Sequence, residues 1–318
     1  MLISAVFQSF YGLTELFGGT ERIFAFKKKW SIGRASGTYI NSNHFSGLLE
    51  MIFPVSVGYL LAKANFFSMK KGLSIKEKIL WFSQEHLQKS ILLGSVSVLI
   101  GIGIFFSRSR TGIFVFFITI SLMFVVHSLV SGKKTMEFSR KKRSGRLIRT
   151  VILAVLFLVI LIGAKPIIER FSWESVARTI RPAIFENTID LIKNFPVFGT
   201  GPGSYVYAYT MFEKIDVRKI VDHAHNDYLE LLAESGFIGG GSLILFAFGA
   251  VGYLLVRMVK RRNYFVVGIS LGCIIGVVAV LIHSISDFNL RIPANAIYFV
   301  TLYALAFKIT DYRRERED

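Results

Sequence analysis

The sequence predicts an all-α, polytopic integral membrane protein, and three observations support this fold class. Of its 318 residues, 53% are hydrophobic, and the mean hydropathy is +0.52. The apolar residues form continuous blocks, several of which reach the roughly 20 residues that a helix needs to cross a bilayer core. The Lys and Arg residues, which give a net charge of +17, lie mostly between those blocks. This distribution is typical of membrane-protein loops and argues against a nucleic-acid partner.

About eight apolar segments are predicted to span the membrane, and together they form one membrane domain over residues 1–318. They cover residues 2–18, 45–63, 90–106, 112–130, 151–165, 236–257, 264–284 and 293–308. The first and the fifth are short. The single cysteine, Cys273, falls in the seventh segment, where it is expected to pack as a small buried residue.

The basic residues predict the orientation of the chain. If all eight segments span, four basic segments share one side: the loops 64–89 and 131–150, the turn 257–262 and the tail 313–316. Cytoplasmic loops keep an excess of Lys and Arg, so that side is predicted to be cytoplasmic. The outer side then receives residues 19–44, 107–111, 166–235 and 285–292. Three lysines, Lys27, Lys28 and Lys29, lie on this outer side and do not follow the bias.

The outer loop 166–235 is far longer than the two to eight residues usual between helices of a bundle, which is typical of a functional loop. It predicts an amphipathic helix from Arg181 to about residue 194, because proline suits a first helical turn and Pro182 follows. One stripe of this helix carries Ile184, Phe185, Ile189, Ile192 and Phe195. The glycine-rich residues 199–203 follow no strand, so a tight turn is predicted rather than a dinucleotide loop. A second helix begins near His225 and runs into the next span.

Four arginines are candidates for an outer anion site: Arg108 and Arg110 between two spans, and Arg178 and Arg181 before the amphipathic helix. In one interpretation they are solvated charges at the membrane edge. In the other they bind phosphate, to which the planar guanidinium group is well suited. The helix that opens at Pro182 would add a positive dipole end.

The densest cluster of titratable groups lies at the end of the long outer loop. His223 and His225 can hold a metal together with a carboxylate. Alternatively, one histidine acts as a general base, because imidazole titrates near neutral pH. In a third interpretation the segment is a polar helix cap, with Asn226 accepting from free amides. Glu230 and Glu234 share a helix face, where they either orient a histidine or an arginine or are solvated.

Taken together, these motifs resemble the O-antigen ligase and Wzy-type polymerase superfamily of bacterial envelope polysaccharide enzymes. The matching segments are residues 34–47, 109–112, 181–203, 225–236 and 283–295. The first reads RASGTYINSNHFSG, the second SRTG, and the fourth HNDYLELLAESG. Phe185 stands where the family usually has tryptophan. The order of the segments and their common outer placement are also similar to the family. The chain predicts fewer spans than its relatives usually have, so an N-terminally short member is expected.

The resemblance implies a glycosyltransferase of the bacterial cytoplasmic (inner) membrane, surrounded by membrane lipids and independent of any metal or cofactor. It would move a glycan from an undecaprenyl-diphosphate donor to a hydroxyl of a lipid or glycan acceptor at the outer face, in lipopolysaccharide or exopolysaccharide biosynthesis. His225 would be the base, and Arg110 and Arg181 would bind the diphosphate. The resemblance assigns substrate binding to Arg34, Asn43, His44, Arg108, Arg178, His223, Asn226 and Glu234.

Three alternatives stay open. Ligation and polymerisation both fit the motifs. A transporter or flippase of the same lipid-linked glycan would place ionisable residues near the middle of spans, whereas the strong candidates here lie at outer helix ends and in one loop. An inactive, truncated relative could serve as a partner subunit.

Overall fold

The computed structural model describes residues 1–63, 85–132, 149–157, 159–161, 165–169, 180–214 and 220–312. The predicted all-α class is confirmed, because these residues are mostly helical. The strands found among them form one antiparallel ribbon of β1 (Arg22–Ile23) and β2 (Phe26–Lys27). Arg178, a predicted anion-site residue, and most of the two basic loops lie outside the described residues.

Five helices are long and apolar enough to cross a membrane. They are α2 (Ser42–Lys63), α4 (Glu85–Phe106, of which Gln88–Phe106 qualifies), α5 (Arg110–Gly132), α11 (Asp227–Val259) and α12 (Tyr264–His283). The other three predicted spans are also helical: α1 (Leu2–Phe17) and Arg149–Leu161 are shorter apolar helices, and α13 (Pro293–Asp311) has 19 residues. The structure therefore confirms membrane-spanning character for five segments and does not confirm the count of eight.

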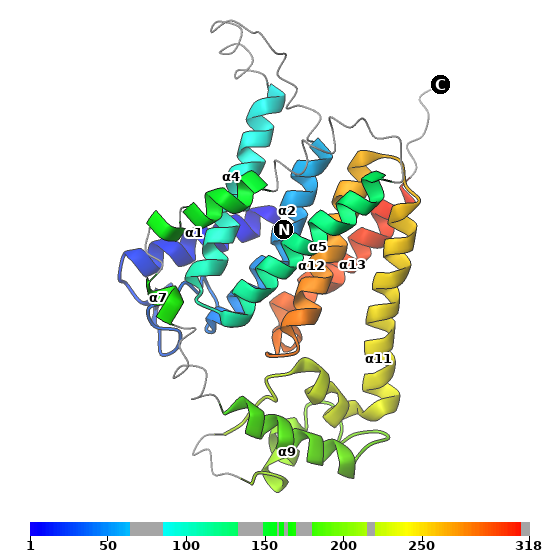
Figure 1. The fold of residues 1–318 in the computed structure, drawn as a ribbon. Helices are drawn as coiled ribbons and strands as arrows, with labels where there is room; N and C mark the ends of the chain where they lie inside the picture. Colours follow the sequence, from blue (N-terminus) through cyan, green and yellow to red (C-terminus); the bar gives the residue numbers. More distant parts are fainter. Residues whose placement is uncertain are drawn as a thin grey trace, which may run out of the picture.

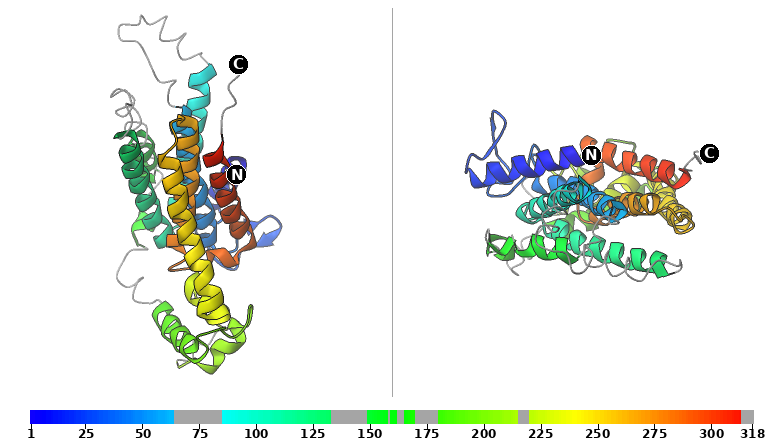
Figure 2. Two further views of the ribbon diagram at one scale, coloured as in Figure 1. Left: turned by 90° about the vertical axis from the view of Figure 1, so that its right-hand side faces the viewer. Right: turned by 90° about the horizontal axis from the view of Figure 1, so that it is seen from above.

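The helices form three layers, seen from above in Figure 2. The middle layer contains α4, α2, α12 and, at its edge, α11. One face carries α5 together with the helix at 149–161, and the opposite face carries α1 and α13. Figure 1 shows that α1 runs across α2 rather than along it. The short helix α7 (Lys165–Ile168) leads toward the outer loop.

The central contact is between α2 and α12, both largely buried. A Cβ atom at Gly276 would lie 2.3 Å from the carbonyl oxygen of Met51, so only glycine fits at this approach. Small residues let helix backbones approach closely inside a bilayer, where packing rather than the hydrophobic effect joins helices. Glu50 and His283 form a fully buried pair across the same contact, with 2.9 Å between Oε2 and Nδ1. His283, the last residue of α12, is fully buried and joins the two helices, which agrees with a structural role.

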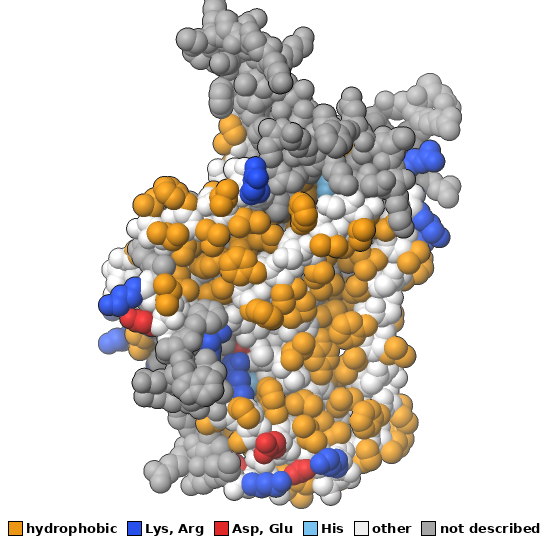
Figure 3. Space-filling view, in the orientation of Figure 1, with side chains coloured by type: hydrophobic (Ala, Val, Ile, Leu, Met, Phe, Trp, Pro, Cys, Tyr) orange, Lys and Arg blue, Asp and Glu red, His pale blue; other side chains and the backbone are white. Residues whose placement is uncertain are grey.

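The surface of the bundle is a broad apolar band, with charged side chains at its lower end and around its edges (Figure 3). Helix α11 contributes strongly exposed apolar residues, among them Leu245, Phe246 and Val256. The helix ends that flank the basic loops and the turn after α11 lie at one end of the bundle, and the outer-loop helix α9 lies at the other (Figure 1). The described residues thus keep the predicted grouping of segments, and which end faces the cytoplasm stays a prediction.

One of the lysines that do not follow the charge bias is buried. The Nζ atom of Lys28 lies 2.6 Å from an Oε1 atom of Glu15 on α1, and it donates to the carbonyl oxygen of Arg34 at 3.0 Å. Only 5% of Lys28 is exposed. This lysine is therefore a structural link between α1 and the segment that carries Arg34, rather than a free outer charge.

The predicted amphipathic helix is α9 (Arg181–Asn194), and its boundaries agree with the prediction. Its predicted stripe is wrong in part, because Ile189 and Phe195 are about 40% exposed. The buried face consists of Ile184, Asn187, Thr188, Leu191 and Ile192. Two of these are polar, and they are buried because they bond the hydroxyls of Tyr209 and Tyr205 at 3.0 and 2.7 Å. Tyr205 begins α10 (Tyr205–Ala208), and Tyr209 begins the 3-10 turn η3 (Tyr209–Met211).

The glycine-rich turn fastens the outer loop to α11. The amides of Thr200 and Gly201 donate to the carbonyls of Ala233 and Glu234, both at 2.9 Å. Helix α11 is interrupted at this point by Gly236, with φ 61° and ψ −172°. The freed amide of Phe237 donates to the carbonyl of Pro196 at 2.8 Å. The predicted tight turn is therefore present, and its hydrogen bonds go to a kinked helix rather than to an anion.

Candidate functional site

Four of the predicted site residues meet at one buried carboxylate, Asp287, in the turn between α12 and α13. Asn43 donates from Nδ2 to Oδ2 at 2.7 Å, and Arg181 reaches the same oxygen from Nη2 at 3.2 Å. The other oxygen, Oδ1, lies 3.4 Å from Nδ1 of His225 and 3.6 Å from Nε2 of His44. Asp287 itself is fully buried. One carboxylate thus brings together residues from α2, α9 and the start of α11.

Local structure fixes each of these side chains. Asn43 and His44 lie in the first turn of α2, and Arg181 is the first residue of α9, where it also donates to the carbonyl of Ser286. His225 precedes α11 with a left-handed φ of 52°. A non-glycine residue in this conformation carries backbone strain, which persists only where the surroundings hold it in place.

Asp287 is an anion in this setting. Burial would raise its pKa, but the contacts with His225 and His44 and the charge of Arg181 hold the pKa of Asp287 well below its usual range. An ionised carboxylate only accepts hydrogen bonds, so Nδ1 of His225 carries the proton that faces it. The second ring nitrogen, Nε2, then has a lone pair and can take a proton from a substrate. The 3.4 Å separation is long, as is common in sites without substrate.

Four arginines gather beside this centre. Burial, together with the charges of Arg108 and Arg110, lowers the pKa of Arg34. Arg110, the first residue of α5, is in turn within electrostatic reach of Arg181. Arg108 has a left-handed φ of 52°, and burial lowers its pKa as well. Cations that depress one another's pKa would be stabilised by an anion, and guanidinium groups match phosphate oxygens.

A second cluster lies on the other side of Phe288. His223 contacts Glu230 with 2.9 Å between Nδ1 and Oε1, and Arg291 approaches the same Oε1 from Nε at 3.3 Å. Arg291 also contacts Glu234, at 2.6 Å from Nη1 to Oε2. Of the two alternatives for the glutamates, the structure therefore shows the one in which they orient a histidine and an arginine.

The geometry separates the two histidines and gives Asn226 a structural role. His223 and His225 point Nδ1 at different carboxylates, and the ring of Phe288 stacks on His223 with centroids 4.0 Å apart. Within the described ranges, no three His, Cys, Asp or Glu side chains are grouped to hold a metal ion. Asn226 caps α11, because its Oδ1 accepts from the amides of Tyr228 and Leu229, both at 3.0 Å. Its Nδ2 donates to the carbonyl of Ile285 at 2.9 Å, so the helix-cap interpretation holds for this residue.

These features agree with a comparison to known families. A family model described as O-antigen ligase matches residues 95–244. This part of the chain is therefore similar to O-antigen ligases, which supports a membrane enzyme of the ligase or polymerase type. No curated protein matches the chain.

The matched region holds Arg110, Arg181 and His225, whereas Asn43, His44 and Asp287 lie outside residues 95–244. The candidate site is therefore completed by α2 and by the turn before α13. Contacts across 244 residues, from Asn43 to Asp287, join these parts.

Sequence reasoning did not assign three residues of the site: Asp287, Phe288 and Arg291. Each belongs to the polar segment 283–295, which stood out as an ionisable patch at the outer end of a predicted span. A carboxylate and an arginine within such a patch are signals of a site. The partners of these residues could not be read from the sequence, because they lie on other helices.

The His223–Glu230 pair predicts a pH-dependent contribution to stability. Burial opposes it, but the hydrogen bond and the charge of Glu230 raise the pKa of His223. A raised pKa in the folded state stabilises the fold fully below the unfolded value of about 6.5, and this stabilisation is lost as the pH rises through the folded value. Replacing His223 with Gln is therefore expected to lower the free energy of unfolding by about 1 kcal/mol at most, since the pair is partly exposed. The difference from the wild type should be largest below pH 6.5 and shrink above it, and a difference constant across pH 5–9 would contradict this assignment.

Proposed function

We propose that this protein transfers a glycan from an undecaprenyl-diphosphate donor to a hydroxyl of a lipid or glycan acceptor at the outer face of the cytoplasmic membrane. One observation carries the proposal: Asp287 contacts both Arg181, which belongs to the arginine cluster, and His225, whose Nε2 is left basic. A diphosphate leaving group and a proton acceptor are the two components that such a transfer needs.

In the proposed reaction His225 takes the proton of the acceptor hydroxyl at Nε2, and the hydroxyl oxygen attacks the anomeric carbon of the donor glycan. The bond between that carbon and the phosphate oxygen breaks, and undecaprenyl diphosphate leaves with both electrons. Arg110 and Arg181 stabilise the negative charge that develops on the leaving oxygen, and Arg34 and Arg108 add to the positive field. His225 then releases its proton to solvent.

The placement of the site supports the outer face. The site residues lie at the end of the bundle opposite to the helix ends that flank the basic loops. Cytoplasmic loops hold most of the Lys and Arg in membrane proteins, so the opposite end is assigned to the exterior.

One observation favours a transporter as the second candidate. The Glu50–His283 pair is ionisable and buried between two spans, as in proton-coupled transport. The pair also bonds Ser46 on α2, where Ser46 Oγ donates to Glu50 Oε1 at 2.6 Å. Among the described residues it occupies a closely packed helix contact, which fits a structural link better than a pathway.

Alanine substitutions at Arg110, Arg181 and His225 test the proposal. Each is expected to lower transfer by about 10²–10³-fold, the usual loss when a base or a charge-stabilising donor is removed. The measurement is transfer from a lipid-linked oligosaccharide by the purified protein in lipid nanodiscs. Arg262→Ala is the matched control, because Arg262 is an exposed arginine at the far end of the bundle.

The producing bacterium gives the decisive comparison. If the attachment and length of the polymer survive all three alanine substitutions, the proposal is wrong. In a deletion strain, donor accumulating in the outer leaflet supports the transferase, whereas donor accumulating in the inner leaflet supports the flippase.

A further inference from the structure

The ring of Phe288 contacts three histidines of the site. Its centroid lies 4.0 Å from that of His223, 4.5 Å from that of His44 and 5.1 Å from that of His225. His223 stacks nearly parallel to it, with 19° between the ring planes, whereas His44 and His225 meet it at 72° and 60°. Phe288 is only 9% exposed. A single buried apolar ring therefore packs against imidazoles that come from the first turn of α2 and from the segment before α11.

The backbone of Phe288 connects the two clusters of the site. Its amide donates to Oδ1 of Asp287 at 3.0 Å, and this is the carboxylate oxygen that faces His225. Its carbonyl oxygen accepts from the amide of Arg291 at 3.2 Å, at the end of the 3-10 turn η4 (Asn289–Arg291). The main chain of Phe288 is therefore hydrogen-bonded to a charged residue of each cluster.

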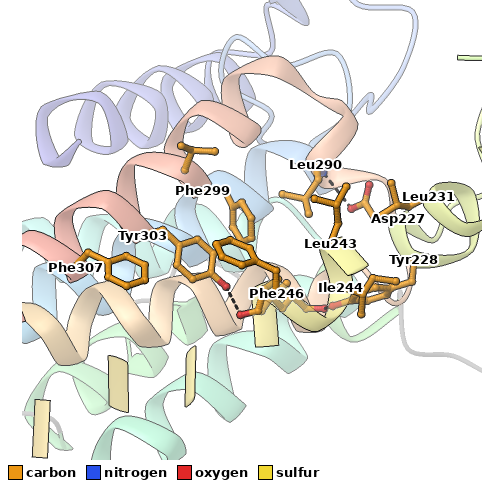
Figure 4. Close-up of a pocket in the computed structure, with 13 residues that line it drawn as sticks. Asp227, Tyr228, Leu231, Leu243, Ile244, Phe246, Leu290, Phe299, Tyr303 and Phe307 are labelled. Carbon is orange, nitrogen blue, oxygen red and sulfur yellow. Dashed lines mark hydrogen bonds between the residues drawn. The ribbon is translucent and has the colours of Figure 1, made fainter. Parts of the chain in front are cut away.

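The turn that carries Phe288 is fixed to the first residue of α11. Oδ2 of Asp227 accepts from the amide of Leu290 at 3.0 Å (Figure 4) and from Oγ of Ser284 at 2.7 Å. The amide of Asp227 donates to the carbonyl of Ser284 at 2.9 Å. These bonds hold the turn on both sides of Phe288, so its ring has a defined place relative to His225, which lies two residues before Asp227.

A histidine ring that is held by one hydrogen bond can still turn. The terminal torsion of histidine, χ2, has a broad energy profile, so intrinsic rotamer preference does not fix the plane of the ring. The contact of Nδ1 with Asp287 fixes one atom of His225, and the direction of Nε2 still depends on rotation about that contact. A close-packed apolar neighbour supplies the second constraint. For His225 that neighbour is Phe288.

Three groups approach Oδ1 of Asp287. A carboxylate offers about four lone-pair sites, which is about two for each oxygen. The amide of Phe288 occupies one of them, so Nδ1 of His225, at 3.4 Å, and Nε2 of His44, at 3.6 Å, compete for the other. Because both imidazoles pack against the ring of Phe288, neither can turn toward Oδ1 and displace the other without losing this contact.

We propose that Phe288 is a positioning residue of the transfer reaction: together with Asp287, it sets the plane of the His225 imidazole and so the direction in which Nε2 points. This inference rests on the proposed function. Phe288 touches no substrate and moves no proton in the proposed reaction, so it acts through the geometry of the base. A misplacement of about 1 Å in a reacting group can cost about 100-fold in rate. Loss of the ring is therefore expected to lower kcat and to leave KM nearly unchanged.

Phe288→Leu tests this role, and Phe53→Leu is the matched control. Leucine keeps most of the apolar volume and removes the flat ring. Phe53 is buried in α2 and packs on Phe116, with centroids 4.8 Å apart, so its replacement removes the same ring from the core of the bundle. Transfer from a lipid-linked oligosaccharide is measured in lipid nanodiscs, with kcat given per molecule of folded protein.

The imidazole resonances supply a readout that does not depend on activity. Nuclear magnetic resonance of isotope-labelled histidine distinguishes the two neutral tautomers of each ring, and the variants His223→Gln and His225→Gln assign the signals. In the wild type, His225 is expected to carry its proton on Nδ1, and the ring protons of His223 are expected to be shifted upfield by the face of Phe288. Phe288→Leu should lose the upfield shift and show both tautomers of His225.

The expected result is a kcat of Phe288→Leu about ten- to hundredfold below the wild type with KM within about twofold, whereas Phe53→Leu stays within about twofold in both. An unchanged kcat, a loss matched by Phe53→Leu, or imidazole signals equal to those of the wild type would overturn the inference. If leucine prevents folding, Phe288→Met, which fills the space with a flexible chain, repeats the comparison. Absence of transfer by the wild type would contradict the proposed function, and the imidazole spectra would still decide whether Phe288 orients the histidines.

Discussion

Replacing Asp287 with Asn is expected to lower glycan transfer by about 10²–10³-fold, although the residue itself touches no substrate in the proposed reaction. The carboxylate holds Arg181 and His225 at once, and its second oxygen also accepts from Asn43. A neutral amide of the same shape removes the negative charge that faces Arg181. It also no longer selects the His225 tautomer with a basic Nε2, because an amide can donate as well as accept.

The same substitution is expected to destabilise the protein by about 1–3 kcal/mol, since a buried ion pair that loses one member leaves an uncompensated charge. This expected decrease in stability is smaller than the full cost of breaking a buried ion pair, because the side chain of Arg181 is 28% exposed. Asp190→Asn is the matched control: this aspartate pairs with Lys193 and Lys214 on the surface of the outer loop. Solvent screens exposed ion pairs, so the control should keep its activity and its melting temperature. Equal activity of Asp287→Asn and the wild type would show that Asp287 does not organise the site.

Replacing Gly236 with Ala is expected to cost the protein its ordered outer loop and to reduce transfer at least tenfold. Gly236 has φ 61° and ψ −172°, a region of backbone conformation populated almost only by glycine. A Cβ atom there would lie 2.2 Å from the carbonyl oxygen of Val197. Alanine would therefore separate the turn at 196–201 from α11 and release the segment that positions Arg181 and Glu234.

Gly241→Ala is the control for this prediction. Gly241 lies in the same helix, and a Cβ atom there would meet no atom within 4 Å. Alanine is favoured over glycine inside a helix by about 1 kcal/mol, so the control should be neutral or slightly stabilising. Limited proteolysis of the outer loop and transfer activity are the measurements. If Gly236→Ala resisted the protease as well as the wild type does, the turn at 196–201 would not depend on Gly236 for its attachment to α11.

The local elements of this protein could be predicted from short stretches of its sequence. Continuous apolar runs predicted the spans, because a bilayer selects for length and apolar character that are visible in a single segment. The Arg181-Pro182 start and the proline at 196 predicted the bounds of α9, because capping and helix termination depend on a few neighbouring residues. The helix-cap alternative for Asn226 could be proposed from the sequence for the same reason, because a cap depends on neighbouring residues.

The tertiary structure decided which of those elements meet. Periodicity within α9 could not show that Ile189 would face outward, because Tyr205 and Tyr209 make the polar residues Asn187 and Thr188 part of the buried face. Nor could the charge of Lys28 show that it is paired with Glu15.

The candidate site depends most on which helices pack together. His225 and Asn43 contact Asp287 across 62 and 244 residues of chain. A single sequence reports how each residue fits its own helix and does not report which helices pack together. The residues of the reaction were therefore recognisable as a set of candidates, and the buried carboxylate that joins them became visible only once α2, α9, α11 and the turn after α12 were placed in space.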